Sequence, residues 1–495
     1  MPLNLVTDAW IPVIRHGSPI TIRPHEIAVE GVERLNWPRD DLNLACLELL
    51  IGLVYLADPP RDDGDWHDRY GAPRADRLRG ALECFGPHVE LTGNGPRFLQ
   101  DLEPFEARVK RSAVSPPDML FVDSAGANTA RNNRDLMVKR NRYTSLPLPL
   151  AAMSLYTLQA FAPGGGAGNR TSMRGGGPLV TLVKPLDADT YSLWQTVWCN
   201  VPEGQPLAAE DAAQALPWLR PTRTSEKGQT VTPDMSHDAE AFFGMPRRLR
   251  LVFENDTATG VVQRRYGTHY ARWVHPLSPY YCREAGGERL PVHSRPGKVS
   301  FRNCLGLAFG RADELRLVAQ TVRRYHALVD APDAELCVGG WAMSKMKPLD
   351  FSLHAYPTFR LDKPMEMRVG ALVEVASFVS RMLYALLKKA VALQGSAADA
   401  VQETFFSDTE PEFLNAVRCV AEGRGPDVED AWMKALGSTA LAIFDRYALS
   451  ALSSRSMCDI EAAVAARSTL LSILAKQAGV RERLCLPAAA SEHAP

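Results

Sequence analysis

Cysteine and histidine clusters at metal-binding spacing are missing from this chain of 495 residues. Its nine cysteines are scattered, and no two of them form a CxxC motif. Zinc ribbons and disulfide frameworks depend on closely or regularly spaced cysteines, so neither is predicted, and the cysteines are interpreted as reduced thiols. Because the histidines are isolated as well, we predict no bound metal and no cofactor. One of them, His275, is interpreted as structural.

The chain also has no export signal and no long apolar run. Its N-terminus, MPLNLVTDAWIPV, lacks a basic segment followed by an apolar one. No apolar run approaches the ~20 residues that a membrane-spanning helix needs. A cytoplasmic protein without membrane contact is therefore expected.

Positive charge is not in surplus, and catalytic signatures are missing. Lysine and arginine total 56 against 57 aspartates and glutamates, so any site for a polyanion must come from local clusters of cations. The sequence contains no nucleophile elbow, no HExxH motif and no paired carboxylates with nearby histidines. Since catalytic groups can converge in space, these absences favour a binding protein without excluding an enzyme.

A change of sequence pattern along the chain predicts two domains, as its length also suggests. Residues 1–362 mix strand-like runs with helical ones, which indicates a large mixed α/β N-terminal domain. Residues 363–495 are predicted to form a C-terminal four-helix bundle, so the fold class is α+β. Its helices are expected at 365–393, 409–421 (with Pro411 in the first turn), 427–448 and 460–480.

The most informative stretch is 161–178, FAPGGGAGNRTSMRGGGP, called the glycine loop below. Seven glycines and two prolines lie there between two apolar runs. Without a Cβ, glycine lets the backbone approach another surface closely, and Arg170 and Arg174 add positive charge. A surface loop whose glycines only supply unusual dihedrals is the alternative. Neither GxxxxGK[ST] nor a complete GxGxxG is present, since Asn169 stands at the third glycine position, so a nucleic-acid groove is favoured over a nucleotide.

Two further segments contain candidate DNA contacts. Residues 131–142, RNNRDLMVKRNR, form the densest basic cluster of the chain, for which a solvated loop is the alternative. An apolar run at 150–160 lies between this cluster and the glycine loop, and a helix of that length spans only ~16 Å, so both loops would share one scaffold. In 336–347, LCVGGWAMSKMK, the Gly339-Gly340 pair is expected to break a β-like run.

The end of this last segment has the composition of a DNA wedge. Lys345 and Lys347 flank Met346 just before Pro348. A long cation beside an unbranched apolar side chain at a loop tip is suited to press between base pairs. An ordinary basic turn is the alternative.

In combination, these motifs resemble the CasA family, the large subunit of the type I-E CRISPR Cascade surveillance complex. The resemblance rests on LVTDAWIPV, PRDDLNLACLELL, the glycine loop followed by LVTLV, WVHPLSP, and VGGWAMSKM before the C-terminal helices. It covers almost the whole chain. Each motif alone is weak, and their combination is specific.

The resemblance implies a non-catalytic subunit that recognises the protospacer-adjacent motif of double-stranded DNA from the minor groove. It would help to open the duplex for guide-RNA pairing, and so for R-loop formation. The implied partners are target DNA, a helicase-nuclease, and the guide-RNA ribonucleoprotein with the other Cascade subunits. These subunits include the small subunits, which the bundle would contact, and the subunit that caps the guide 5′ end. Two hypotheses compete with it: a phosphate-binding enzyme, either a nuclease or nucleotide-dependent, that uses the glycine loop, and a purely structural adaptor.

The resemblance also places the family's DNA contacts on this sequence. The glycine loop matches Gly164–Gly168, with Ala167 where glycine is usual, a first loop matches 136–140, and the wedge falls at 344–346. Lys345 and Met346 replace the glutamine and alanine of the usual Asn-Gln-Ala tip, and the cysteine cluster that holds zinc in some relatives is missing. A minor-groove cation is assigned to Arg264 or Arg265. The expected DNA contacts are Leu136, Met137, Val138, Lys139, Arg140, Gly164, Gly165, Gly166, Ala167, Gly168, Arg170, Arg174, Arg264, Ser344, Lys345, Met346 and Lys347.

Overall fold

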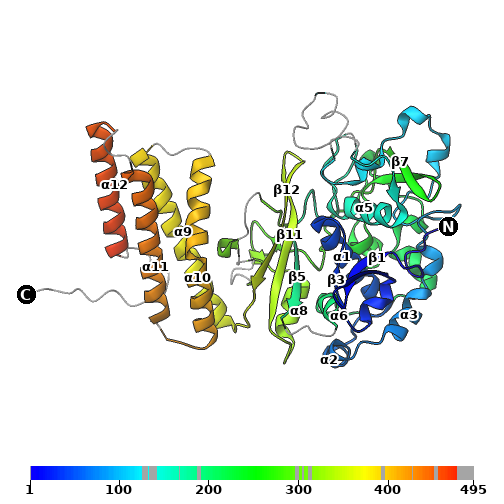
Figure 1. Ribbon diagram of the computed structural model, residues 1–495, viewed down its shortest axis with the longest axis horizontal. Helices are drawn as coiled ribbons and strands as arrows, with labels where there is room; N and C mark the ends of the chain where they lie inside the picture. Colours follow the sequence, from blue (N-terminus) through cyan, green and yellow to red (C-terminus); the bar gives the residue numbers. More distant parts are fainter. Residues whose placement is uncertain are drawn as a thin grey trace, which may run out of the picture. The chain divides into compact units, whose positions relative to one another are not determined.

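A computed structural model of the chain describes residues 2–124, 132, 142–166, 168–186, 191–295, 300–303, 306–309, 315–391, 396–425, 427–450 and 455–476. The chain divides into two compact units (Figure 1). Unit 1 contains Met1–Pro296 and Ala319–Pro357, and unit 2 contains Gly297–Val318 and Thr358–Pro495. The mixture of helices and strands, with a helical C-terminal region, confirms the predicted α+β class. The division at residue 362 into two functional domains stays a prediction.

The described strands of unit 1 form small antiparallel sheets. In the first sheet, β1 (Ile11–Arg15) lies between β2 (Ser18–Ile22) and β3 (Val32–Leu35). In the second, β7 (Thr257–Arg264) lies between β4 (Leu146–Pro147) and β6 (Arg248–Glu254). In the third, β11 (Ala334–Ser344) lies between β12 (Lys347–Pro357) and β5 (Val180–Pro185). The short strands β8 (Tyr280–Tyr281) and β9 (Leu290–Pro291) also pair.

Two apolar helices form the centre of unit 1. Helix α1 (Asp40–Ala57) packs against α5 (Leu148–Phe161), and both are buried on nearly all sides. Acidic residues in the first turn of α1 suit the positive end of the helix dipole. The other described helices of unit 1 are α2 (Asp63–Gly71), α3 (Ala75–Glu83), α6 (Ser192–Trp198), α7 (Glu240–Phe243) and α8 (Gln320–Ala327).

The predicted break at Gly339-Gly340 is wrong, because β11 continues through both glycines. A Cβ on Gly339 would stand 2.8 Å from Cδ2 of Leu44, and one on Gly340 would stand 2.6 Å from the carbonyl oxygen of Pro178. These glycines therefore let other segments approach the strand closely, as glycine within a strand often does. Beyond them β11 turns directly into β12, so this region is one long hairpin.

Unit 2 is built from long helices that lie side by side in Figure 1. They are α9 (Lys363–Val391), α10 (Ser396–Ala421), α11 (Asp427–Phe444) and α12 (Met457–Lys476), with a π-helical turn at Asp445–Leu449 and the short strand β10 (Arg316–Leu317). The prediction that Pro411 lies in a first turn is wrong, because α10 begins at Ser396. The buried Val401, Phe405 and Phe413 extend an apolar stripe past the proline, and their burial outweighs its missing N–H donor.

The core of unit 2 also includes a segment distant from these helices in the sequence. Phe301 stacks on Phe413, with ring centroids 4.3 Å apart, and meets Trp432 edge-on at 5.7 Å. Among the described residues, α9 has the length and apolar composition of a membrane-spanning helix. Its apolar residues, such as Val369 and Leu372, are buried, which is typical of a helix in the core of a bundle.

Candidate nucleic-acid interface

The pairing of β5 with β11 brings the glycine loop and the tip of the β11–β12 hairpin together. The register pairs Gly339 with Val180, the first residue of β5. The rest of β11, up to Ser344, extends past β5 by roughly 16 Å at ~3.3 Å per residue. Because the glycine loop leads directly into β5, this overhang lies beside the loop. Two of the three segments expected to contact DNA are therefore neighbours.

Several loop glycines make room for this hairpin. A Cβ on Gly164 would stand 3.0 Å from Cγ of Met346, and one on Gly176 would stand 2.9 Å from its Sδ. A Cβ on Gly177 would stand 2.4 Å from the carbonyl oxygen of Trp341. For Gly164 the close approach that the sequence indicated is thus made by the protein's own hairpin.

The hairpin tip, defined here as Ser344–Lys347, is exposed and conformationally strained. Lys345 and Met346 both have left-handed backbones, with φ of +48° and +63°. Two-residue hairpin turns of this kind favour Asn-Gly, and an L-residue in this region costs ~1–2 kcal/mol. Half of the Met346 side chain is covered, whereas Lys345 and Lys347 are exposed and form no ion pair with any described residue. Strain of this kind is often found at functional sites.

The outer turn of the glycine loop presents bare backbone. Gly165 and Gly166 are exposed, and a Cβ on Gly166 would meet no atom within 4 Å. Gly168 has a φ of +82°, and a Cβ there would stand 2.9 Å from the backbone nitrogen of Tyr266. That nitrogen donates a 3.0 Å hydrogen bond to the Gly168 carbonyl, which fixes the turn. Ala167 lies outside the described residues.

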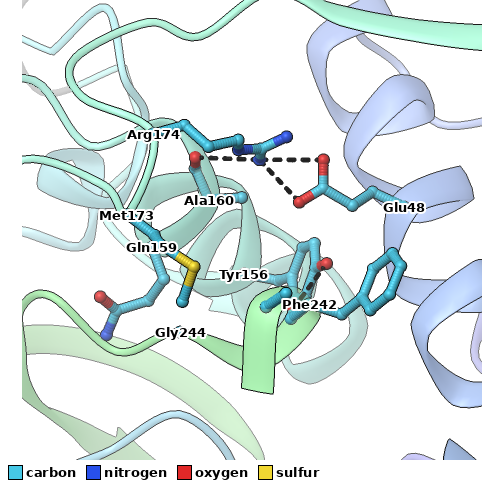
Figure 2. Close-up of a pocket in the computed structure, with 9 residues that line it drawn as sticks. Glu48, Tyr156, Gln159, Ala160, Met173, Arg174, Phe242 and Gly244 are labelled. Atoms are coloured by element: carbon cyan, nitrogen blue, oxygen red, sulfur yellow. Dashed lines mark hydrogen bonds and ion pairs between the residues drawn. The ribbon is translucent and has the colours of Figure 1, made fainter. Parts of the chain in front are cut away.

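Arg174, one of the expected DNA contacts, is buried and bound to a carboxylate, so its assignment as a DNA contact is corrected. Its side chain is 2% exposed, and Nη2 donates to Oε1 and Oε2 of Glu48 at 2.7 and 3.0 Å (Figure 2). Nη1 donates to the Ser278 hydroxyl at 3.2 Å. A buried carboxylate on α1 outcompetes solvent for this guanidinium, since either charge alone would be costly to bury. Arg174 therefore anchors the C-terminal half of the loop to the core.

His275 completes this buried cluster and is structural, as interpreted from the sequence. Its Nε2 lies 3.4 Å from Oε1 of Glu48, and its Nδ1 accepts a hydrogen bond from the backbone of Leu277 at 3.2 Å. Burial and the neighbouring Arg174 lower the pKa of His275 to about 4, so the ring is neutral. Burial alone would raise the pKa of Glu48, but Arg174 and His275 hold it below its ordinary value.

The cavity beside this cluster is very small. It is lined by Glu48, Tyr156 and Arg174, among others (Figure 2), and its volume of ≈ 10 Å³ is at the lower limit for a single water molecule. No nucleotide fits there. Within the part of the chain that the structure describes, no three acidic, histidine or cysteine side chains are grouped as metal ligands.

The remaining predicted contacts have varied surroundings. Arg170 is half-buried, and its Nε donates to the Ser225 hydroxyl at 2.8 Å. Arg264 forms a 2.7 Å ion pair with Glu103 and lies over the Phe105 ring at 4.4 Å, whereas its neighbour Arg265 is exposed. Residues 136–140 lie outside the described residues, so their place relative to the glycine loop stays a prediction.

The basic residue beneath the loop, Arg247, is not among the contacts expected from the sequence. It is 7% exposed, and its Nη2 donates to the carbonyl oxygen of Pro163. Burial lowers the pKa of this guanidinium to about 10. No local motif signals it, because the loop that covers it is far away in the sequence.

Comparison with known proteins identifies the family. A family model for the CRISPR-associated protein Cse1 matches residues 4–443. Thermus thermophilus CasA (Cse1) is similar with a TM-score of 0.74 at 18% identity, over 96% of this chain and 99% of that one. Thermobifida fusca Cse1 has a TM-score of 0.70 at 16% identity, over 98% of each chain. A chain of a CRISPR RNA-guided surveillance complex has a TM-score of 0.70 at 14% identity, over 95% of this chain and 99% of that one.

The structural likenesses concern the fold, and the family model decides membership. It spans nearly the whole chain, including the glycine loop, the hairpin tip and most of the helical region. The resemblance predicted from the sequence motifs is thereby confirmed: the chain belongs to the Cse1 (CasA) family of CRISPR-associated proteins.

Proposed function

We propose that this chain is the non-catalytic large subunit of a type I-E Cascade complex and recognises the protospacer-adjacent motif in double-stranded DNA. The observation that supports this most directly is the adjacency of two exposed features, the bare backbone of Gly165 and Gly166 and the strained hairpin tip. Membership of the Cse1 family and the similarity to a chain of an RNA-guided surveillance complex agree with it.

In this proposal the two features have separate tasks on one duplex. Gly165 and Gly166 enter the minor groove, where a side chain would collide with the walls. Met346 holds the tip on the glycine loop through its contacts with Gly164 and Gly176. Lys345 is then the residue that presses into the end of the duplex, neutralising phosphate as the strands separate. Because the minor groove distinguishes base pairs poorly, several related motifs should be accepted.

The remaining expectations belong to the same proposal. Residues 136–140 and Ala167 would add contacts to the duplex, and Arg265, with its exposed side chain, suits the minor-groove cation better than the paired Arg264. Residues 363–495 would contact the small subunits, and a neighbouring subunit would cap the guide 5′ end. The opened duplex would pair with guide RNA and recruit a helicase-nuclease in the cytoplasm.

The test measures binding of target duplexes by the reconstituted complex across a library of flanking motifs. Lys345→Ala should abolish motif-dependent binding while assembly, followed by gel filtration, stays intact. Lys110→Ala removes another exposed lysine, outside the loop and the tip, and should leave the motif profile unchanged. An unchanged profile for Lys345→Ala would reject the tip assignment. Turnover of DNA or ATP by the isolated chain with a divalent metal would favour the enzyme hypothesis.

A further inference from the structure

A buried cation without a counter-charge lies beneath the glycine loop. The described part of the chain buries the arginines Arg69, Arg174, Arg247 and Arg250. Three of them bind carboxylates, namely those of Asp58, Glu48 and Glu106. Arg247 alone pairs with no carboxylate of the described residues, and its Nε has no hydrogen-bond partner there. Since an unpaired buried charge is costly, an anion bound beside it would be stabilised, and the described residues supply none.

The guanidinium of Arg247 is covered by backbone rather than by a side chain. Its Nη1 lies 2.7 Å, and its Nη2 3.2 Å, from the point where a Cβ on Gly165 would stand. Gly165 itself is exposed, as is Gly166 beside it. The missing side chain at position 165 thus leaves the guanidinium just below the exposed turn of the loop. The Gly165 N–H donates to the Asn169 carbonyl at 3.2 Å, so an anion that settles on this turn would meet the Gly166 N–H and the charge of Arg247.

We propose that Arg247 and the exposed backbone of Gly165 and Gly166 form a phosphate site, occupied by one phosphodiester of the bound duplex. This inference rests on the proposed DNA-binding function and adds a backbone contact to it. The forked donors of a guanidinium match phosphate oxygens, and partial burial strengthens the attraction. The exposed Lys345 and Lys347 on the neighbouring tip favour a polyanion as the source of the phosphate.

A phosphate contact has a specific role in such an interface. It fixes the position and register of the loop on the duplex and reads no sequence. The site therefore predicts an electrostatic contribution that is the same for every flanking motif. This separates it from the hairpin tip, whose proposed role depends on the motif.

Arg247→Met is the variant that tests the site, because it removes the guanidinium and leaves the glycine backbone free to enter the groove. It breaks no ion pair within the described residues and removes one hydrogen bond, to the Pro163 carbonyl, so the melting temperature of the isolated chain should fall only slightly. Arg247→Lys is the second variant, since it keeps a positive charge beneath the loop. Arg79→Met is the matched control, because Arg79 is an exposed arginine outside the loop and the tip.

The measurement is duplex binding by the assembled complex over a salt series. Loss of one phosphate contact should lower the slope of log K against log salt by ~0.9 in Arg247→Met, and weaken binding about five-fold at 0.15 M salt for all motifs alike. Arg247→Lys, which keeps the charge, should keep the slope, and Arg79→Met should match the wild type. An unchanged slope in Arg247→Met, or a changed motif ranking in that variant, would overturn the phosphate site.

Two further arms separate the possible failures. If Lys345→Ala abolishes motif dependence while Arg247→Met keeps the full slope, the phosphate site is wrong and the proposed function stands. If neither variant affects duplex binding, both are wrong. ATP added to the isolated chain should not raise its melting temperature, and a rise that Arg247→Met removes would assign the site to a nucleotide instead of DNA.

Discussion

Removal of the guanidinium from Arg174 should destabilise unit 1 strongly. In Arg174→Met the Glu48 carboxylate would stay 1% exposed and lose both of its short hydrogen bonds, at 2.7 and 3.0 Å. Its remaining neighbours in the cluster are neutral, namely the His275 ring at 3.4 Å and the Tyr156 hydroxyl. Breaking one side of a buried ion pair costs ~3–5 kcal/mol, because the other charge stays desolvated. At ~2 °C per kcal/mol for a large domain, the melting temperature should fall by roughly 6–10 °C.

Urea unfolding followed by tryptophan fluorescence suits this prediction. Of the nine tryptophans only Trp432 belongs to unit 2, so the signal reports mainly on unit 1. The matched control is Arg79→Met, which removes an exposed 3.0 Å ion pair with Asp76. Exposed pairs contribute ~0–1 kcal/mol, so this variant should unfold almost like the wild type.

A double-mutant cycle decides whether the cost comes from the unpaired charge. The variant that combines Glu48→Met with Arg174→Met buries no ion, so it should be less destabilised than the sum of the two single variants. Additive losses, or a loss below ~1 kcal/mol in Arg174→Met, would refute the reasoning. The loop would then be anchored by its backbone alone.

Two further predictions concern the same region. The pKa of His275 is about 4 in the folded chain against 6.5 ordinarily, so the unfolded chain takes up the proton first as the pH falls. The free energy of unfolding should therefore drop between pH 6.5 and 4, by ~3 kcal/mol at most. An equally steep drop in His275→Gln would contradict this. Gly177→Ala combines a φ of +64° with a methyl group 2.4 Å from the carbonyl oxygen of Trp341. In urea unfolding it should therefore lower the free energy of unfolding by more than the ~1–2 kcal/mol of backbone strain expected for the unobstructed Gly93→Ala. Equal losses of free energy in the two variants would argue against close packing of loop and hairpin.

Local patterns in the sequence were enough to predict the elements whose stability is local or depends on one apolar face. The apolar run at 150–160 predicted α5, and the apolar residues of 365–393, which recur at the spacing of one buried face, predicted α9. The density of glycine identified the loop as a place of close approach. The family motifs then predicted the α+β fold and the membership that the family model confirms.

Tertiary structure decided what each of these residues contacts. Arg174 is separated from Glu48 by 126 residues, so no spacing rule could predict that it pairs inward while Arg247 stays unpaired beneath the loop. The carbonyl oxygen that excludes a side chain at Gly177 belongs to Trp341, on a strand far along the chain. Composition could predict a loop that needs bare backbone. Only the folded chain determines which glycines are covered by the hairpin and which remain exposed, because that depends on neighbours the chain acquires by folding.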